Sequence, residues 1–207
     1  IDVPALDAFA QKNAALIYLE ILPGSFVNEG ELLARVMRAS TEPLDEPQVR
    51  QILSAITLGV RRTFEHDPRF GLSVLSEIAS RALSPAVNDP GTAIDVIGRG
   101  IRAFNAQARS GTLEKPEAQC SCVHVRGLSV EDMFDDFFSP IARDGAALIE
   151  VNIRLVKALA SLAHSCPALY ADLGARHIGV ILERAEAAMT LDGDKARLRA
   201  CIAASLP

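Results

Sequence analysis

Residues 81–93 constrain the fold more than any other part of the chain, because they stop one helix and start another. Pro85 lacks the backbone N–H that a continuing helix needs, and it disfavours helical geometry at the preceding Ser84. Asp89 stands before a second proline, a pattern typical of an N-cap followed by proline in the first helical turn. The stretch therefore predicts a rigid elbow between two helices, tied down by the polar side chains of Ser84 and Asn88.

Apolar residues recur at three- and four-residue steps along most of the chain, the period of a helix that buries one face. The chain has no Trp and only 5% aromatic residues, whereas hydrophobic residues make up 49%. Ala, Leu, Ile and Val must therefore fill the core, as in helical bundles. We expect a mainly α fold built on an antiparallel helical bundle, in which Gly98 and Gly100 mark the close approach of a neighbouring element. The expected helices span about residues 47–60, 68–83, 90–108, 129–138, 141–163, 168–188 and 194–204.

The first 40 residues do not follow this helical period throughout. A short helix at residues 2–13 precedes apolar runs at 15–21, 26–27 and 32–37, which are separated by turn sequences and predict short antiparallel strands. The Ser-, Thr-, Pro- and acid-rich segment 38–46 is typical of a linker. We expect two domains: a small α/β unit at residues 1–40, and a helical bundle at 41–207 with one strand near 120–126.

The charge balance bears on possible partners. The formal net charge is −5, and the 21 Lys and Arg are interspersed with 26 acids, whereas a nucleic-acid groove needs clustered cations. We therefore expect no nucleic-acid partner. No apolar run approaches the ~20 residues of a membrane-spanning helix. Motifs for phosphate, dinucleotide, zinc-protease, serine-hydrolase and calcium chemistry are absent from the sequence, so we expect no cofactor.

Several stretches of the sequence resemble one bacterial protein family. They are Arg62-Thr-Phe-Glu-His-Asp-Pro-Arg-Phe-Gly71, Leu75-Ser-Glu-Ile-Ala79, the elbow Arg81-Ala-Leu-Ser-Pro-Ala-Val-Asn-Asp-Pro-Gly-Thr-Ala93, and the turn-rich segment Gly24-Ser-Phe-Val-Asn-Glu-Gly30. They resemble the soluble C-terminal part of the predicted membrane proteins of unknown function catalogued as family 2254. The resemblance implies that membrane-embedded helices precede this region in a bacterial cell-membrane protein, and it implies no reaction. We expect the soluble domain on the cytoplasmic side.

The elbow is also the best candidate binding site. Free N–H groups at the start of the second helix can receive an anion, with a cationic side chain one turn before the break. The alternative is that the Asp89 carboxylate already fills that place and the polar residues only fix the turn. Glu77 and Arg81 have the i, i+4 spacing of an ordinary helix-surface ion pair. The candidate ligand-binding residues are Arg81, Ser84, Asn88, Asp89 and Thr92, with Glu77 or His66 as the ionisable partner.

His66 lies between Glu65 and Asp67, and three adjacent ionisable residues suggest a general base or a metal site. Consecutive residues of a helix point about 100° apart, so the three converge only where the chain breaks. Asp67 before Pro68 is typical of a helix cap, which is the interpretation we favour.

The four cysteines are too few for a disulfide scaffold, and free thiols in a reducing compartment are the simplest expectation. Cys120, Cys122 and His124 would share one face of a strand, and Cys with His is a zinc-type ligand set. Their spacing is unusual for zinc, so we favour buried thiols and expect no metal.

These observations favour a soluble, non-enzymatic domain of a bacterial integral membrane protein, which supports assembly, partner binding or regulation. The membrane would be reached through a preceding N-terminal region, and a homo-oligomer fits the exposed apolar helix faces. The alternative is an enzyme or a small-ligand or anion sensor, with its site at the Ser84, Asn88 and Asp89 elbow.

Overall fold

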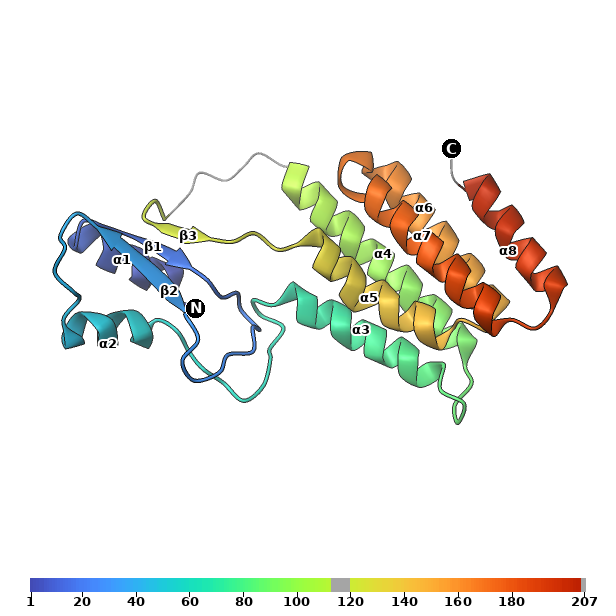
Figure 1. Cartoon of the computed structure of the whole chain (residues 1–207), viewed down its shortest axis with the longest axis horizontal. Helices are drawn as coiled ribbons and strands as arrows, with labels where there is room; N and C mark the ends of the chain where they lie inside the picture. The colour runs from blue at the N-terminus through green and yellow to red at the C-terminus, as the bar shows by residue number, and fades with distance from the viewer. Residues whose placement is uncertain (113–119, 206–207) are drawn as a thin grey trace. The chain divides into compact units, whose positions relative to one another are not determined.

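The computed structural model describes residues 1–112 and 120–205, and Figure 1 shows their helices and strands. Eight helices and three short strands lie in this part of the chain, which confirms the expected mainly α fold with a small β unit. The described residues form two compact units: an N-terminal unit of residues 1–70 and 120–128, and a helical unit of residues 71–112 and 129–205. None of the described helices combines the length and the apolar character that crossing a bilayer requires.

The N-terminal unit combines two helices with a three-stranded sheet. Its first helix is capped by Asp2, whose side chain accepts a hydrogen bond from the Ala5 N–H at 2.9 Å. The elements are α1 (Val3–Lys12), β1 (Ala15–Leu19), β2 (Ala34–Arg38), α2 (Glu46–Ser54) and β3 (Val123–Val125).

The sheet has the order β2-β1-β3, and its two pairings differ in direction. β2 runs antiparallel to β1, with Val36 opposite Ile17, whereas β3 runs parallel to β1, with Val123 opposite the same Ile17. The sequence predicted antiparallel strands in the first 40 residues and did not predict the parallel partner. Asp7 of α1 holds the chain just before β3, because its Oδ1 accepts a hydrogen bond from the Cys122 N–H at 2.8 Å.

The N-terminal unit continues past residue 40, where the sequence suggested a division between domains. Ile52 and Ala55, at and just after the end of α2, lie in the same apolar cluster as Ile17, and Val123 of β3 completes it. The small unit therefore extends through residue 70 and also includes a segment from much later in the chain.

Two expected elements are shorter than predicted or do not form. No strand forms at residues 26–27, and α2 ends at Ser54 instead of continuing to residue 60. Phe26 is 86% exposed, and Leu58 and Val60 are exposed as well, whereas Ala55 and Ile56 just after α2 are buried without extending the helix. Hydrophobic spacing alone is therefore not enough to form an element there.

In the described residues of the helical unit, six helices surround one apolar core, and Figure 1 shows them as a bundle. Phe104, Phe134, Phe137 and Phe138 lie at its centre, with ring centroids of the Phe104 and Phe134 pair 4.9 Å apart. The helices are α3 (Pro68–Ala82, which begins in the N-terminal unit), α4 (Pro90–Thr112), α5 (Val130–Asp144), α6 (Ile149–Ser165), α7 (Pro167–Ala188) and α8 (Asp192–Ser205).

α5 runs through Pro140, where the sequence predicted a break. Proline removes one helical N–H, yet nearby carbonyls gain other donors: Ser76 Oγ donates to the Phe137 carbonyl at 3.0 Å, and Arg184 donates to the Ser139 carbonyl at 2.8 Å. The break falls instead at residues 145–148. There the buried Asn152 side chain donates to three carbonyls within 3.0 Å.

The expected close approach at the glycines of α4 is confirmed at Gly100. A Cβ atom built there would lie 2.1 Å from Cζ of Phe137, so the α5 ring rests directly on the α4 backbone. At Gly98 an added Cβ would make only an ordinary contact, 3.4 Å from an Arg154 nitrogen.

Candidate functional site

The elbow between α3 and α4 is held mainly by backbone hydrogen bonds. The Asp89 N–H donates to the Ala82 carbonyl at 2.8 Å, and the Asn88 N–H donates to the Ser84 carbonyl at 2.8 Å. The Ser84 hydroxyl donates to the Arg81 carbonyl at 2.7 Å and so satisfies one of the last acceptors of α3. Ser84 therefore ties down the turn, as predicted.

Asp89 caps α4 with both carboxylate oxygens. Oδ1 accepts from the Thr92 N–H at 3.0 Å, and Oδ2 accepts from the Thr92 hydroxyl at 2.5 Å. The hydrogen bonds from the Thr92 hydroxyl and N–H hold the pKa of Asp89 below its ordinary value of 3.8. A carboxylate thus already faces the positive end of α4, which disfavours a second anion at the same place.

Asn88 has a different role from the expected one. Its backbone adopts the left-handed region, with φ of +48°, a conformation that Asn accepts more readily than most residues. Its side chain is exposed and makes no hydrogen bond to any other described residue. The backbone geometry of Asn88, and not its amide group, shapes the turn.

A hollow of about 430 Å³ lies beside the elbow, within the helical unit. We call it the elbow hollow. Four of the seven predicted site residues line it, whereas Ser84 and Asn88 do not. Its lining consists of the apolar Val74, Ile78, Ala82 and Val87 and the polar Glu77, Arg81, Asp89 and Thr92.

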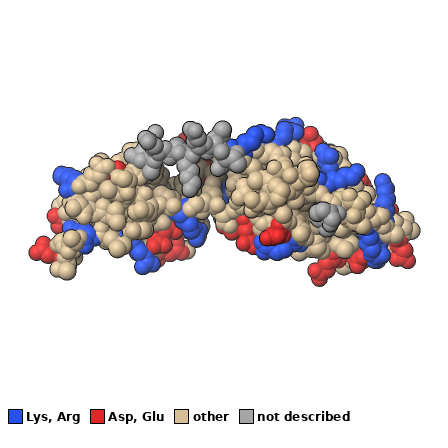
Figure 2. Space-filling view, turned by 90° about the horizontal axis from the view of Figure 1, so that it is seen from above, with Lys and Arg blue, Asp and Glu red and all other residues tan. Residues whose placement is uncertain are grey.

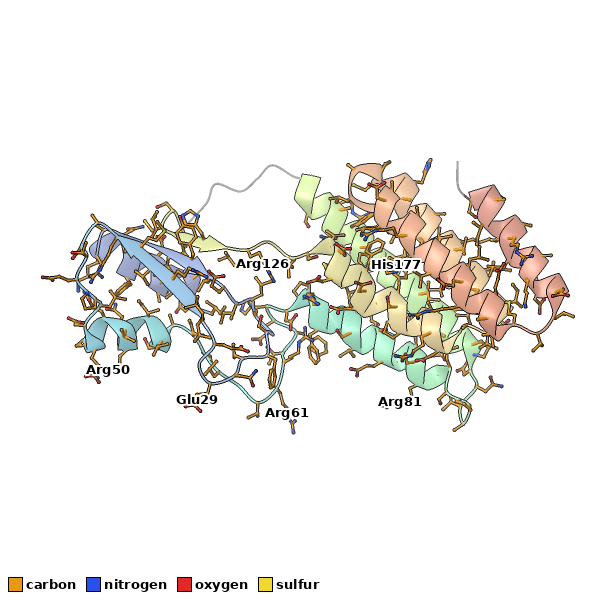
Figure 3. All side chains as sticks on the ribbon, viewed as in Figure 1. Glu29, Arg50, Arg61, Arg81, Arg126 and His177 are labelled. Atoms are coloured by element: carbon orange, nitrogen blue, oxygen red, sulfur yellow. The ribbon has the colours of Figure 1, made fainter. Side chains whose placement is uncertain are left out.

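Glu77 and Arg81 line this hollow without pairing with one another. Arg81 lies near the C-terminal end of α3, as Figure 3 shows, and Glu77 lies one turn before it. Both side chains are exposed, and neither forms an ion pair within the described part of the chain. The i, i+4 pair expected from the sequence is therefore not formed.

His66 is not part of the elbow hollow. It is an exposed residue of the N-terminal unit, next to the buried Asp67. Asp67 caps α3 as predicted, since its Oδ1 accepts from the Phe70 N–H at 3.0 Å. Its carboxylate also accepts two hydrogen bonds from Arg62, at 2.7 and 3.0 Å.

Sequence reasoning missed the cluster that forms around this carboxylate. Gly24, with φ of +83°, approaches so closely that an added Cβ would lie 1.8 Å from Asp67 Oδ2. The Arg62 guanidinium lies over the Phe70 ring, 5.1 Å from its centroid. Gly24 and Asp67 are far apart in sequence, and no local spacing signals their contact.

The residues proposed as weak metal ligands are not gathered into one site. Cys122 packs against the apolar core of the N-terminal unit, whereas His124 is exposed and stacks on Tyr18 with ring centroids 4.6 Å apart. They do not share one face as expected, because β3 begins only at residue 123. Within residues 1–112 and 120–205 no group of three His, Cys, Asp or Glu residues could hold a metal ion, and the thiols of Cys120, Cys122, Cys166 and Cys201 are unpaired.

Two titratable side chains inside the helical unit, one partly and one fully buried, were not predicted from the sequence. Burial lowers the pKa of His177, which is labelled in Figure 3. Its Nε2 lies 3.5 Å from Oδ1 of Asp135. Burial also raises the pKa of Tyr170 to about 12, and its hydroxyl lies 2.9 Å from the Phe104 carbonyl oxygen and from Gln107 Oε1. The tyrosine has the contacts of a structural core residue.

The sequence is similar to known proteins of one family. The family model described as "Predicted membrane protein (DUF2254)" matches residues 1–161. An uncharacterised protein of Mycobacterium tuberculosis (strain CDC 1551 / Oshkosh), MT1328, is 40% identical over 101 residues, covering 47% of this chain and 19% of the relative. Mb1321c of Mycobacterium bovis (strain ATCC BAA-935 / AF2122/97) is 41% identical over 99 residues, covering 44% of this chain and 19% of the relative.

The matched region thus spans about one-fifth of the length of these curated relatives. No solved structure matches the chain. Because the family model covers more than three-quarters of the sequence, the chain belongs to the DUF2254 family of predicted membrane proteins.

Proposed function

We propose that this chain is a soluble, non-catalytic module of a bacterial integral membrane protein, with a role in assembly or regulation. The observation that carries the proposal is the family match over residues 1–161, since the family is described as a membrane protein. The chain spans a small part of its relatives, so the membrane-embedded part is proposed to lie outside it.

The buried polar residues support a structural role. Asp7 accepts from the Cys122 N–H, Asp67 from Arg62 and the Phe70 N–H, and Ser76 donates to the Phe137 carbonyl. Asn152 donates to three carbonyls of the turn between α5 and α6. These four buried polar side chains thus bond to the backbone, whereas a catalytic group must be free to meet a substrate.

The distribution of charge supports exposure to water. Figure 2 shows Lys and Arg interspersed with Asp and Glu on the face in view, with no single-sign band. Many of the ion pairs are exposed, such as Asp95 with Arg99 and Glu131 with Arg176. A mixed surface of this kind favours a water-facing module, and the described residues on the face in view form no continuous cationic band of the kind that nucleic acid needs.

Cell fractionation tests the membrane proposal. The complete gene product that contains this chain should remain with the membrane after carbonate extraction, and the 207-residue chain alone should not. A complete product that stays in the supernatant would contradict the proposal, whatever the 207-residue chain does.

The module is proposed to lie on the cytoplasmic side of the membrane. Thiol labelling of the complete product tests this placement. All native cysteines of the complete product, including the four of this chain, are replaced by Ser, and Val60→Cys introduces one thiol at a fully exposed position. A membrane-impermeant maleimide should label it only after the cells are permeabilised. Labelling in intact cells would place the module on the outer side.

Self-association belongs to the same proposal. Leu169 and Val180 of α7 are 39% and 44% exposed, and apolar helix faces often close by symmetry. Light scattering of the 207-residue chain should give twice the monomer mass or more. A monomer at every concentration would count against self-association through this part of the protein.

A second function, a small-ligand sensor, is favoured by one specific observation. The elbow hollow is lined by four residues that the sequence predicts as ligand-binding: Glu77, Arg81, Asp89 and Thr92. Its volume falls within the range of small-molecule sites, roughly 300–1,000 Å³. If no compound in a broad metabolite screen raised the melting temperature of the chain, the sensor function would be abandoned.

A further inference from the structure

The elbow hollow presents both signs of charge beside an aliphatic wall. We infer that it binds a small aliphatic zwitterion of the α-amino acid class. This inference rests on the sensor form of the proposed function and specifies its ligand.

The wall is made of branched aliphatic side chains that face the hollow. Val74 and Ile78 lie one turn apart on α3, and Val87 comes from the elbow itself. Ile78 is 46% exposed and Val87 is 54% exposed, so a ligand that covers them removes apolar surface from water. The ligand should therefore carry a branched aliphatic group.

The charged groups of the hollow are available to a ligand. Arg81 and Glu77 form no ion pair within the described residues, although Asp95 and Arg99 of α4, with the same spacing, pair at 2.7 Å. Asp89 accepts from Thr92 with both oxygens, and each oxygen keeps a second lone pair that can accept from a ligand ammonium. The lining thus offers one guanidinium and two carboxylates.

This combination selects a zwitterion over singly charged ligands. A ligand with only a carboxylate would pair with Arg81, but it would be repelled by the like charges of Glu77 and Asp89. A ligand with only an ammonium group would pair with the two carboxylates, but it would be repelled by Arg81. A small molecule that carries both an ammonium and a carboxylate can pair with the two side-chain carboxylates and with the guanidinium, through charge-assisted hydrogen bonds.

A simple anion at the start of α4 fits less well. Asp89 already occupies the N–H of Thr92 through Oδ1, so no vacant anion site is left at that group. The carboxylate of the ligand is therefore assigned to Arg81, and its ammonium to Glu77 and Asp89.

Methyl NMR of the 207-residue chain tests the inference with three probes. They are L-leucine, its deaminated acid 4-methylpentanoate, and its decarboxylated amine isopentylamine. L-leucine should shift the methyl resonances of Ile78 and Val87 in a saturable manner and leave Ile17, in the core of the N-terminal unit, unchanged. The acid and the amine should each bind at least about tenfold more weakly, because each lacks one charge-assisted contact.

Two variants assign the contacts. Arg81→Gln should weaken L-leucine binding at least about tenfold and remove the preference over isopentylamine, and Glu77→Gln should remove the preference over the acid. Arg99→Gln is the matched control: it lies on an adjacent helix, is similarly exposed, and is absent from the lining. It should leave L-leucine binding unchanged.

Each outcome decides a separate question. If isopentylamine or the acid bound as tightly as L-leucine, the zwitterion inference would be overturned, while a ligand site at the elbow would stand. If L-leucine left Ile78 and Val87 unshifted, the inference would also be overturned. Neither result affects the membrane proposal, which depends on the fractionation of the complete product.

Discussion

Gly100 and Gly179 both lie inside helices, but only Gly100 touches a neighbouring side chain. Gly100→Ala forces its new Cβ into the Phe137 ring, and we expect a loss of about 1–3 kcal/mol in unfolding free energy from overpacking. Gly179→Ala, on the exposed side of α7 with no atom within 4 Å, should instead stabilise by about 0.5–1 kcal/mol. Urea unfolding measures both changes, and equal signs for the two would contradict the described α4–α5 contact.

Gly24 and Gly30 give a similar comparison in the N-terminal unit. Both have positive φ, +83° and +87°, so Ala costs roughly 1–2 kcal/mol of backbone strain at either position. Only Gly24 lies against the Asp67 carboxylate, whereas nothing lies within 4 Å of a Cβ at Gly30. We expect Gly24→Ala to lower the melting temperature of this unit clearly more than Gly30→Ala. Equal decreases in melting temperature for the two variants would show that the close approach of Gly24 to Asp67 does not add to the destabilisation.

At the scale of single residues, sequence reasoning succeeded where the cause was local. Asp89 and Asp67 were predicted as helix caps, because an acid before proline fixes its own hydrogen-bond partners within three residues. The amide of Asn88 was expected to tie down the turn, yet its backbone does so instead. The contact of Gly24 with Asp67 depends on the packing of distant segments, which a single sequence does not reveal.

The contact between α5 and α7 should respond to pH through His177. This side chain is only 12% exposed and lies against Phe134 and Phe138. Burial lowers its pKa from the ordinary value of 6.5; the nearby Asp135 and Glu131 raise it, and Arg176 and Arg184 lower it. Because the unfolded chain binds the proton more readily, this contribution to stability is present above pH 6.5 and is lost as the pH falls through the lower folded value.

Denaturant unfolding across this pH range checks the assignment. His177→Gln should flatten the decrease of stability with acid, since the variant has no proton to bind at this position. His124→Gln, at an exposed histidine of the other unit, should leave the decrease unchanged. An identical acid response in the native chain and in His177→Gln would rule out this group as the cause.

At the scale of elements, the periodic helices were predicted and their ends were not. The break expected at Pro140 lies at residues 145–148, and beside the proline Ser76 and Arg184 donate to the carbonyls of Phe137 and Ser139. These donors come from other helices, so local proline rules point to the wrong residue. The elbow, whose stop and start signals are both local, was placed correctly between α3 and α4.

At the scale of the whole chain, the two units should unfold separately. The described apolar core of the N-terminal unit has eight buried residues and that of the helical unit has twenty-six, so we expect the N-terminal unit to melt first. The chain has no Trp and two tyrosines, Tyr18 in one unit and Tyr170 in the other. Replacing one tyrosine by Phe leaves the other as a fluorescent reporter of its own unit. If the two single-tyrosine variants showed unfolding transitions at the same temperature, independent unfolding of the units would be refuted.

The two-unit arrangement was only partly accessible from the sequence. The helical bundle and the small β unit were both expected, because their apolar periods differ. The return of residues 120–128 to the N-terminal unit was not, since a three-residue strand carries little periodic signal. Its partner choice depends on Asp7 and on the buried Val123, which no spacing rule connects with β1.

The parallel pairing of β1 with β3 affects how the protein is made. A ribosome delivers β1 and β2 early, but it delivers β3 only more than a hundred residues after its partner strand. During that interval the nascent chain carries a two-stranded sheet with one unpaired edge along β1. Translation that stalls between α2 and β3 therefore leaves the species most prone to wrong strand pairing with another copy.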